Sequence, residues 1–93
     1  MVKYLSKLNS IDVSTLHIQN LYRTIGENVK RVRKEKGVSQ LDLALAIGYK
    51  SVSSIAKAES LIEGKHFNIE QLFKIAKALE VPLDSFFVGI ERL

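Results

Sequence analysis

The sequence predicts an all-α fold, a compact domain of five helices preceded by a short N-terminal arm. Its 93 residues suit a single hydrophobic core. Apolar side chains recur every three or four residues, and no segment between residues 20 and 87 alternates as a β-strand would. Glycine, serine, asparagine and proline stand where helices of this length would begin and end. We assign residues 1–20 to the arm, 21–87 to the helical domain and 88–93 to a C-terminal tail.

The arm is the least readable part of the chain. Leu5, Leu8 and Ile11 are spaced by three residues, but residues that favour caps and turns interrupt them. A frayed arm, a short extra helix and a strand used in dimerisation all remain open.

The first helix of the domain is predicted in LYRTIGENVKRVRKEK, residues 21–36. Its apolar residues, beginning with Leu21 and Ile25, fall on one face, and charged residues fill the other. Gly37 is placed to end this helix in a left-handed cap.

Two short helices follow. Ser39 is predicted to cap the helix QLDLALA, and Gly48 to allow the sharp turn that ends it. The next helix is expected at about residues 51–60, with Ser51 as its cap. SLIEGKHF, which contains Gly64, loses the helical pattern and is predicted to be a loop.

The last two helices have clear start signals. Asn68 and Gln71 form a potential capping box ahead of IEQLFKIAKALE. The apolar stripe expected on this helix consists of Ile69, Leu72, Phe73, Ile75, Ala76 and Leu79. Pro82 suits the first turn of a final helix, PLDSFF.

Charge is concentrated in the middle of the chain, although the total is only +4. Residues 25–66 carry eight basic side chains and five acidic ones, whereas residues 67–93 carry three and four. An anionic partner is therefore expected to contact the middle part of the chain, residues 25–66.

Other classes of protein are poorly supported. There is no cysteine for a disulfide or a thiolate metal site, and His17 and His66 are too far apart in the sequence to suggest a metal pair. No apolar run is long enough for a membrane span, and the first residues lack the features of a signal peptide, so a cytoplasmic protein is expected. No nucleophile with a base and no phosphate-binding glycine loop suggests an enzyme, and no cofactor is expected.

Two short helices joined by a glycine turn, after a longer basic helix, are typical of helix-turn-helix DNA binding. The segments IGENVKRVRKEKGVSQLDLALAIG, IAKAE and FNIEQLFKIAKALEVPLDSFF make this more specific, because they resemble the Cro and phage-repressor type of domain, the Xre family. The resemblance covers about residues 24–87. The residues that match the family pattern are Arg33, Ser39, Gln40, Leu43, Ala44, Gly48, Glu59, Leu83, Asp84 and Phe86.

One departure from the family pattern lies in the turn. The family places an apolar core residue six positions after the glycine, but here that residue is Ser54, and Ile55 comes one position later. We infer a one-residue insertion between Gly48 and Val52, because an ungapped alignment would bury the charge of Lys57.

The resemblance implies roles for individual residues. Gln40 is expected to hold a DNA phosphate and brace the reading helix, and Arg33 to form a structural ion pair with Glu59. Lys65, in the following loop, is a candidate for phosphate contact. The predicted base-reading set is Lys50, Ser51, Val52, Ser53, Ser54 and Lys57. Within it, Ser51 is also expected to cap its helix, and Val52 is assigned to the core in preference to the interface.

The principal hypothesis is a sequence-specific regulator of transcription that binds double-stranded DNA, a dimeric repressor that reads the major groove. The apolar positions of the arm and the segment FFVGIERL are the candidate dimer surfaces. The alternative is an antitoxin or an adaptor that uses the same fold to bind a protein partner such as a toxin.

Overall fold

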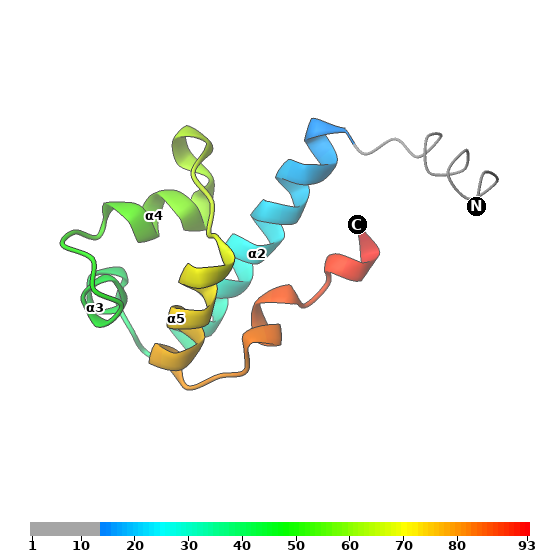
Figure 1. The fold of residues 1–93 in the computed structure, drawn as a ribbon. Helices are drawn as coiled ribbons and strands as arrows, with labels where there is room; N and C mark the ends of the chain where they lie inside the picture. The colour runs from blue at the N-terminus through cyan, green and yellow to red at the C-terminus, as the bar shows by residue number, and fades with distance from the viewer. Residues whose placement is uncertain (1–13) are drawn as a thin grey trace.

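The computed structural model describes residues 14–93, which fold into helices joined by short connections (Figure 1). The α-helices are α2 (Thr15–Glu35), α3 (Gln40–Ala46), α4 (Ser53–Ser60) and α5 (Ile69–Leu79). The short 3-10 helices are η1 (Ile62–Gly64), η2 (Leu83–Phe87) and η3 (Ile90–Arg92). No strand occurs in the described residues, so the all-α prediction is confirmed. The predicted helices correspond to α2–α5 and to η2, which is 3-10 and not α-helical.

Helix α2 begins earlier than the sequence pattern indicated. The Ser14 side chain accepts a hydrogen bond from the backbone amide of His17, and the His17 ring accepts one from the amide of Ser14. This is a capping box with histidine in place of the usual Glu or Gln, so the common signature does not reveal it. The helix therefore extends into the segment assigned to the arm. Leu5, Leu8 and Ile11 lie outside the described residues.

The connection from α2 to α3 follows the predicted caps. Gly37 takes a left-handed φ of +70°, and the amides of Gly37 and Val38 donate to the carbonyls of Lys34 and Arg33 at 3.0 Å each. Ser39 Oγ then accepts from the Asp42 amide at 3.0 Å. These bonds satisfy backbone groups at the end of α2 and at the start of α3.

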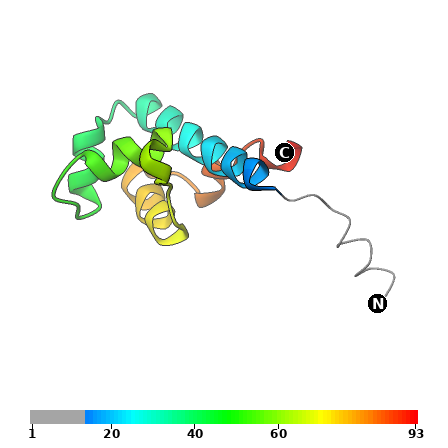
Figure 2. The same cartoon turned by 90° about the horizontal axis from the view of Figure 1, so that it is seen from above.

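The hydrophobic core lies where α2, α3, α4 and α5 meet, and η2 closes it (Figures 1 and 2). The largest side chains that are fully buried come from all five elements, namely Val29, Leu43, Ile55, Ile75 and Phe86. The reading helix expected from the sequence, α4, is thus held by the same core as the rest of the domain.

Helices α2 and α4 approach closely at Gly26. A Cβ atom added at Gly26 would lie 2.8 Å from the carbonyl oxygen of Glu59 and 2.9 Å from that of Ala58. Glycine is needed here for the close approach of two backbones, since α2 has ordinary helical dihedrals at this point.

Helix α5 has the predicted capping box, in which Asn68 Oδ1 accepts from the Gln71 amide and Gln71 Oε1 from the Asn68 amide. Its buried stripe is narrower than predicted. Ile69 and Phe73 are 63% and 52% exposed, because only the side of α5 that carries Leu72 and Ile75 faces the core.

The C-terminal segment is tied to α2 by Asn28. Its Nδ2 donates to the carbonyls of Phe86 and Val88, at 2.9 Å each, and its side chain is nearly buried. FFVGIERL was predicted as a candidate dimer surface, but its first residue, Phe86, is fully buried and belongs to the core. Val88 and Leu93 remain exposed.

None of the helices in residues 14–93 has the length and apolar character that crossing a membrane requires. The same residues contain no cluster of three or more His, Cys, Asp or Glu side chains suited to holding a metal ion.

Candidate nucleic-acid interface

The turn between α3 and α4 begins at Gly48, which has a φ of +88°. The Gly48 amide donates to the Leu45 carbonyl, and the Tyr49 amide to the Ala44 carbonyl at 2.8 Å. Tyr49 is half-buried, and its hydroxyl accepts a hydrogen bond from the Gln71 side chain of α5. The start of the turn is therefore fixed from two sides.

The one-residue insertion in the turn is confirmed. Ile55 is completely buried, whereas Ser54 is exposed on the outer side of α4. An alignment without the insertion would have required the opposite arrangement. The additional residue is accommodated in the bend at residues 50–52, before α4 begins.

Two predictions at the start of α4 are wrong. Ser51 does not cap the helix, because the residue before α4 is Val52, with helical dihedrals of −71° and −18° and no side-chain hydrogen bond to the first turn. Val52 is not a core residue either, since 37% of it is exposed. Both errors follow from the lengthened turn, which leaves Ser51 and Val52 outside the helix and away from the core. The first amides of α4 are thus left for water or an anion.

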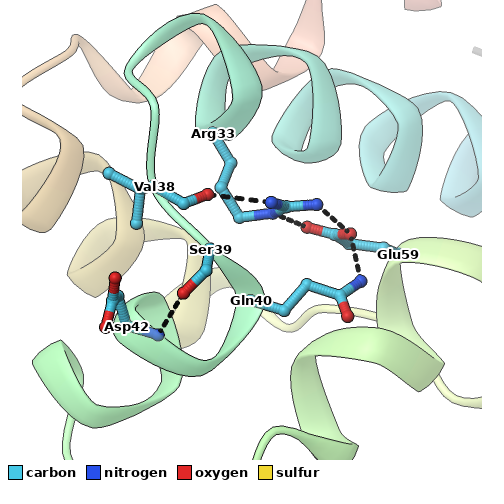
Figure 3. Close-up of polar contacts among 6 residues, drawn as sticks. All are labelled: Arg33, Val38, Ser39, Gln40, Asp42 and Glu59. Atoms are coloured by element: carbon cyan, nitrogen blue, oxygen red, sulfur yellow. Dashed lines mark hydrogen bonds and ion pairs between the residues drawn. The ribbon is translucent and has the colours of Figure 1, made fainter.

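The predicted ion pair between α2 and α4 is present and buried (Figure 3). Arg33 Nε donates to Glu59 Oε2 at 2.7 Å, and Arg33 Nη2 to Glu59 Oε1 at 3.1 Å. Arg33 Nη1 also donates to the Val38 carbonyl at 2.8 Å. The side chains of Arg33 and Glu59 are 7% and 0% exposed. The pair joins the end of α2 to the end of α4, and its planar bidentate geometry fixes their relative orientation.

Gln40 contacts the same carboxylate. Its Nε2 donates to Glu59 Oε1 at 2.9 Å, so the first residue of α3 is linked to α4 (Figure 3). This geometry is what bracing of the reading helix requires. Contact between Gln40 and a DNA phosphate stays a prediction.

The outward side of α4 borders a shallow groove of about 210 Å³. The residues that line it are Ser53, Ser54, Lys57, Ala58, Lys65, His66 and Gln71. Four residues of the predicted DNA-binding set therefore lie around one groove, although they come from both α4 and the loop after it. Lys50, Ser51 and Val52 do not line the groove but are exposed in the adjoining turn.

Sequence reasoning missed the partner of Lys57. Lys57 Nζ lies 2.9 Å from Glu63 Oε2. This hydrogen bond is the main cause that lowers the pKa of Glu63, and the positive charge of Lys57 lowers it further. The two residues are six positions apart in the sequence, a spacing that no helical pattern brings together. The left-handed φ of +58° at Glu63 turns the chain back toward α4, and a non-glycine residue gives no sign of such a conformation in the sequence.

The loop also makes an aromatic contact that the sequence did not reveal. The His66 ring stacks on Tyr22 of α2, with ring centroids 3.6 Å apart and planes inclined by 11°. The loop that carries Lys65 is thereby held against α2.

Comparison with known proteins agrees with this geometry. A family model described as helix-turn-helix matches residues 29–86, which include α3, α4 and the turn between them. No curated protein matches the chain.

Proposed function

This chain belongs to the helix-turn-helix family of the Cro and phage-repressor type, and from that premise we propose that it is a sequence-specific transcriptional repressor that binds double-stranded DNA. The observation that carries the proposal is the division of α4 into two sides. Ile55 and Glu59 are buried against the domain, and Ser53, Ser54 and Lys57 face outward. A short helix anchored in this way can enter the major groove.

The outward residues suit modest base recognition. Serine hydroxyls and the Lys57 ammonium can bond base edges, and exposed Val52 can pack on a thymine methyl. Lys50 and Ser51, in the lengthened turn, would reach the same major groove of the DNA. The set contains no Arg, Asn or Gln, so it offers no bidentate base contact, and part of the specificity should come from DNA shape.

Phosphate contacts are assigned to Gln40 and Lys65. Gln40 stands at the first position of α3, where helix amides and the macrodipole favour an anion. Lys65 is exposed beside the groove, in a loop that the stack of His66 on Tyr22 holds in place. Such contacts set the position of the protein on the duplex but do not specify its sequence.

One α4 makes few base contacts, which favours a homodimer on a two-fold related operator. Half-sites would then lie about 34 Å apart, one turn of B-DNA. Exposed apolar residues suited to a dimer surface occur at both ends of the described chain, and η3 packs beside α2 (Figures 1 and 2). These residues are Leu16, Ile18, Val88 and Leu93.

Selection of bound fragments from a random DNA pool tests the proposal, because it reports both the half-site and the spacing. Salt titration of the selected duplex should show an affinity that falls steeply with salt. Lys65→Gln should reduce the slope of log K against log salt by about 0.9, the value for one lost phosphate contact. Arg92→Gln, an equal change of charge in η3, should leave it unchanged. Absence of binding to any duplex at low salt would contradict the proposal.

A protein-binding adaptor or antitoxin is the second candidate. It is favoured by Leu41 and Leu45, which are 49% and 56% exposed on the outer side of α3. A specific complex with a purified partner, weakened by Leu45→Asp but not by Ser54→Asp, would support this function. Binding to DNA that is weakened by Ser54→Asp but not by Leu45→Asp would support the repressor function.

A further inference from the structure

Lys57 stands one turn beyond Ser53 and Ser54 on the outward side of α4, yet its charge is already paired. Lys57 Nζ and Glu63 Oε2 are 2.9 Å apart, and the two side chains are 34% and 61% exposed. In the free protein, the one basic residue in the outward part of α4 therefore has an intramolecular counterion. A DNA phosphate or base that bonds Lys57 has to compete with this carboxylate.

The backbone around Glu63 is arranged for this contact at a conformational cost. Leu61 and Glu63 both have left-handed φ values, of +54° and +58°, although neither is glycine. Single residues other than glycine, asparagine and aspartate seldom adopt this conformation, and it is maintained only where the surroundings require it. Here the two residues reverse the chain after α4, and Glu63 returns to Lys57.

The position of Glu63 is electrostatically unusual. It is paired with Lys57, which lines the groove together with Lys65, and Lys65 also contributes to lowering the pKa of its carboxyl group. An anion at this place opposes the approach of a phosphate backbone. Glu63 therefore lowers the affinity for DNA, and it does so least where the DNA offers Lys57 a better acceptor than a phosphate.

We propose that Glu63 is a specificity-determining residue, which holds Lys57 in the free protein and thereby suppresses sequence-independent binding to DNA. On the duplex, Lys57 must leave Glu63, and the acceptor at the bound site has to compensate for the lost pair. The proposal rests on the DNA-binding function above and adds a residue that makes no contact with DNA bases itself.

The first test uses a random-sequence duplex, so no operator needs to be known. Glu63→Gln should tighten binding to this duplex about two- to fivefold at low salt, the range expected for release of an exposed ion pair. The salt slope should become steeper by up to about 0.9, because Lys57 is then free to neutralise a phosphate. Glu91→Gln in η3 makes the same change of net charge away from the groove and should alter neither quantity by a comparable amount.

A double-mutant cycle separates the pair from general repulsion. In the Lys57→Gln background, Glu63→Gln should have little effect beyond that of Glu91→Gln. An equal tightening with and without Lys57 would overturn the proposal, and so would weaker binding by Glu63→Gln, which would mean that Glu63 positions Lys57 for DNA. Thermal unfolding of each variant confirms that the fold is retained.

NMR titration of the Glu63 carboxyl group provides a readout independent of affinity. Its pKa is lowered in the free protein and should rise on DNA binding, when Lys57 leaves and phosphates approach. A pKa that stays low in the complex would show that the pair persists, contrary to the proposal. If the unaltered protein binds no duplex, the proposed function fails; if it binds but these variants behave alike, only the role of Glu63 fails.

Discussion

At the scale of single residues, the position of α4 depends on Glu59. Its side chain is completely buried and accepts three hydrogen bonds, two from Arg33 of α2 and one from Gln40 of α3. A buried carboxylate without such partners would be strongly destabilising. Three helices therefore meet at one carboxylate.

Glu59→Gln should lower the free energy of unfolding by about 3–5 kcal/mol, because Arg33 then remains buried without its counterion. Denaturation by urea measures this change. Glu35→Gln removes the partner of Arg31 from a pair in which both side chains are about half exposed, and should cost about 0–1 kcal/mol. Equal losses from the two variants would contradict a structural role for the buried pair.

The sequence predicted some of the contacts and positions of single residues around α4 but not others. The Arg33–Glu59 pair and the inward position of Ile55 followed from the family pattern and from the cost of burying Lys57. Ser51 and Val52 were misplaced because the pattern has no rule for how a longer turn is spaced. Glu63 was not predicted, because its contact with Lys57 depends on a left-handed backbone that the residue type does not announce.

At the scale of helices, the key feature is the contact of α2 with α4. The backbones meet at Gly26, where the carbonyl oxygens of Ala58 and Glu59 occupy the space of a Cβ atom. Backbone atoms of a helix cannot move aside as a flexible side chain does. Any larger residue at this position must separate the two helices.

Gly26→Ala should therefore destabilise the domain by about 0–2 kcal/mol, which is the usual overpacking cost of about 1–3 kcal/mol less the gain in helix propensity. Helix propensity acts in the opposite direction, favouring alanine by about 1 kcal/mol in an α-helix. Thermal or urea unfolding decides between the two effects. Lys30→Ala, at an exposed position of the same helix, should change stability by less than about 0.5 kcal/mol. An increase in stability for Gly26→Ala would contradict the close contact.

Helix boundaries were predictable where conventional caps are present. Gly37, Ser39 and the pair of Asn68 and Gln71 act as predicted. The start of α2 was placed too late because its capping box uses His17. The exposure of Ile69 and Phe73 shows that periodicity marks an apolar side of a helix but does not give the width that neighbouring helices cover.

For the whole molecule, exposed apolar side chains occur at both ends of the described chain, as well as on α3 and α5. Leu16 is 62% exposed near the start of α2, and Val88 is 59% exposed where Asn28 holds the C-terminal segment against α2. This surface is the proposed dimer interface. The sequence pointed to the C-terminal segment but could not separate buried Phe86 from exposed Val88.

Leu16→Glu should shift the protein from dimer to monomer in sedimentation or light scattering, because a charge in an apolar interface is costly. Affinity for an operator with two half-sites should fall at least tenfold, whereas affinity for a single half-site should be unchanged. Leu41→Glu, a similar change on α3, should leave the oligomeric state unaffected. A monomeric unaltered protein at micromolar concentration, or a dimer that survives both Leu16→Glu and Val88→Glu, would reject this interface.

The two sides of α4 also bear on how DNA preference could diverge among related chains. Ile55, Ala58 and Glu59 maintain the fold, and Ser53 and Ser54 contribute nothing to the core. If Ser53 and Ser54 read DNA bases, as proposed above, mutation at these positions would alter the preferred operator without a loss of folding free energy. Duplicated copies of such a protein could acquire separate target sites in few steps, while every copy keeps the same core and the same placement of α4.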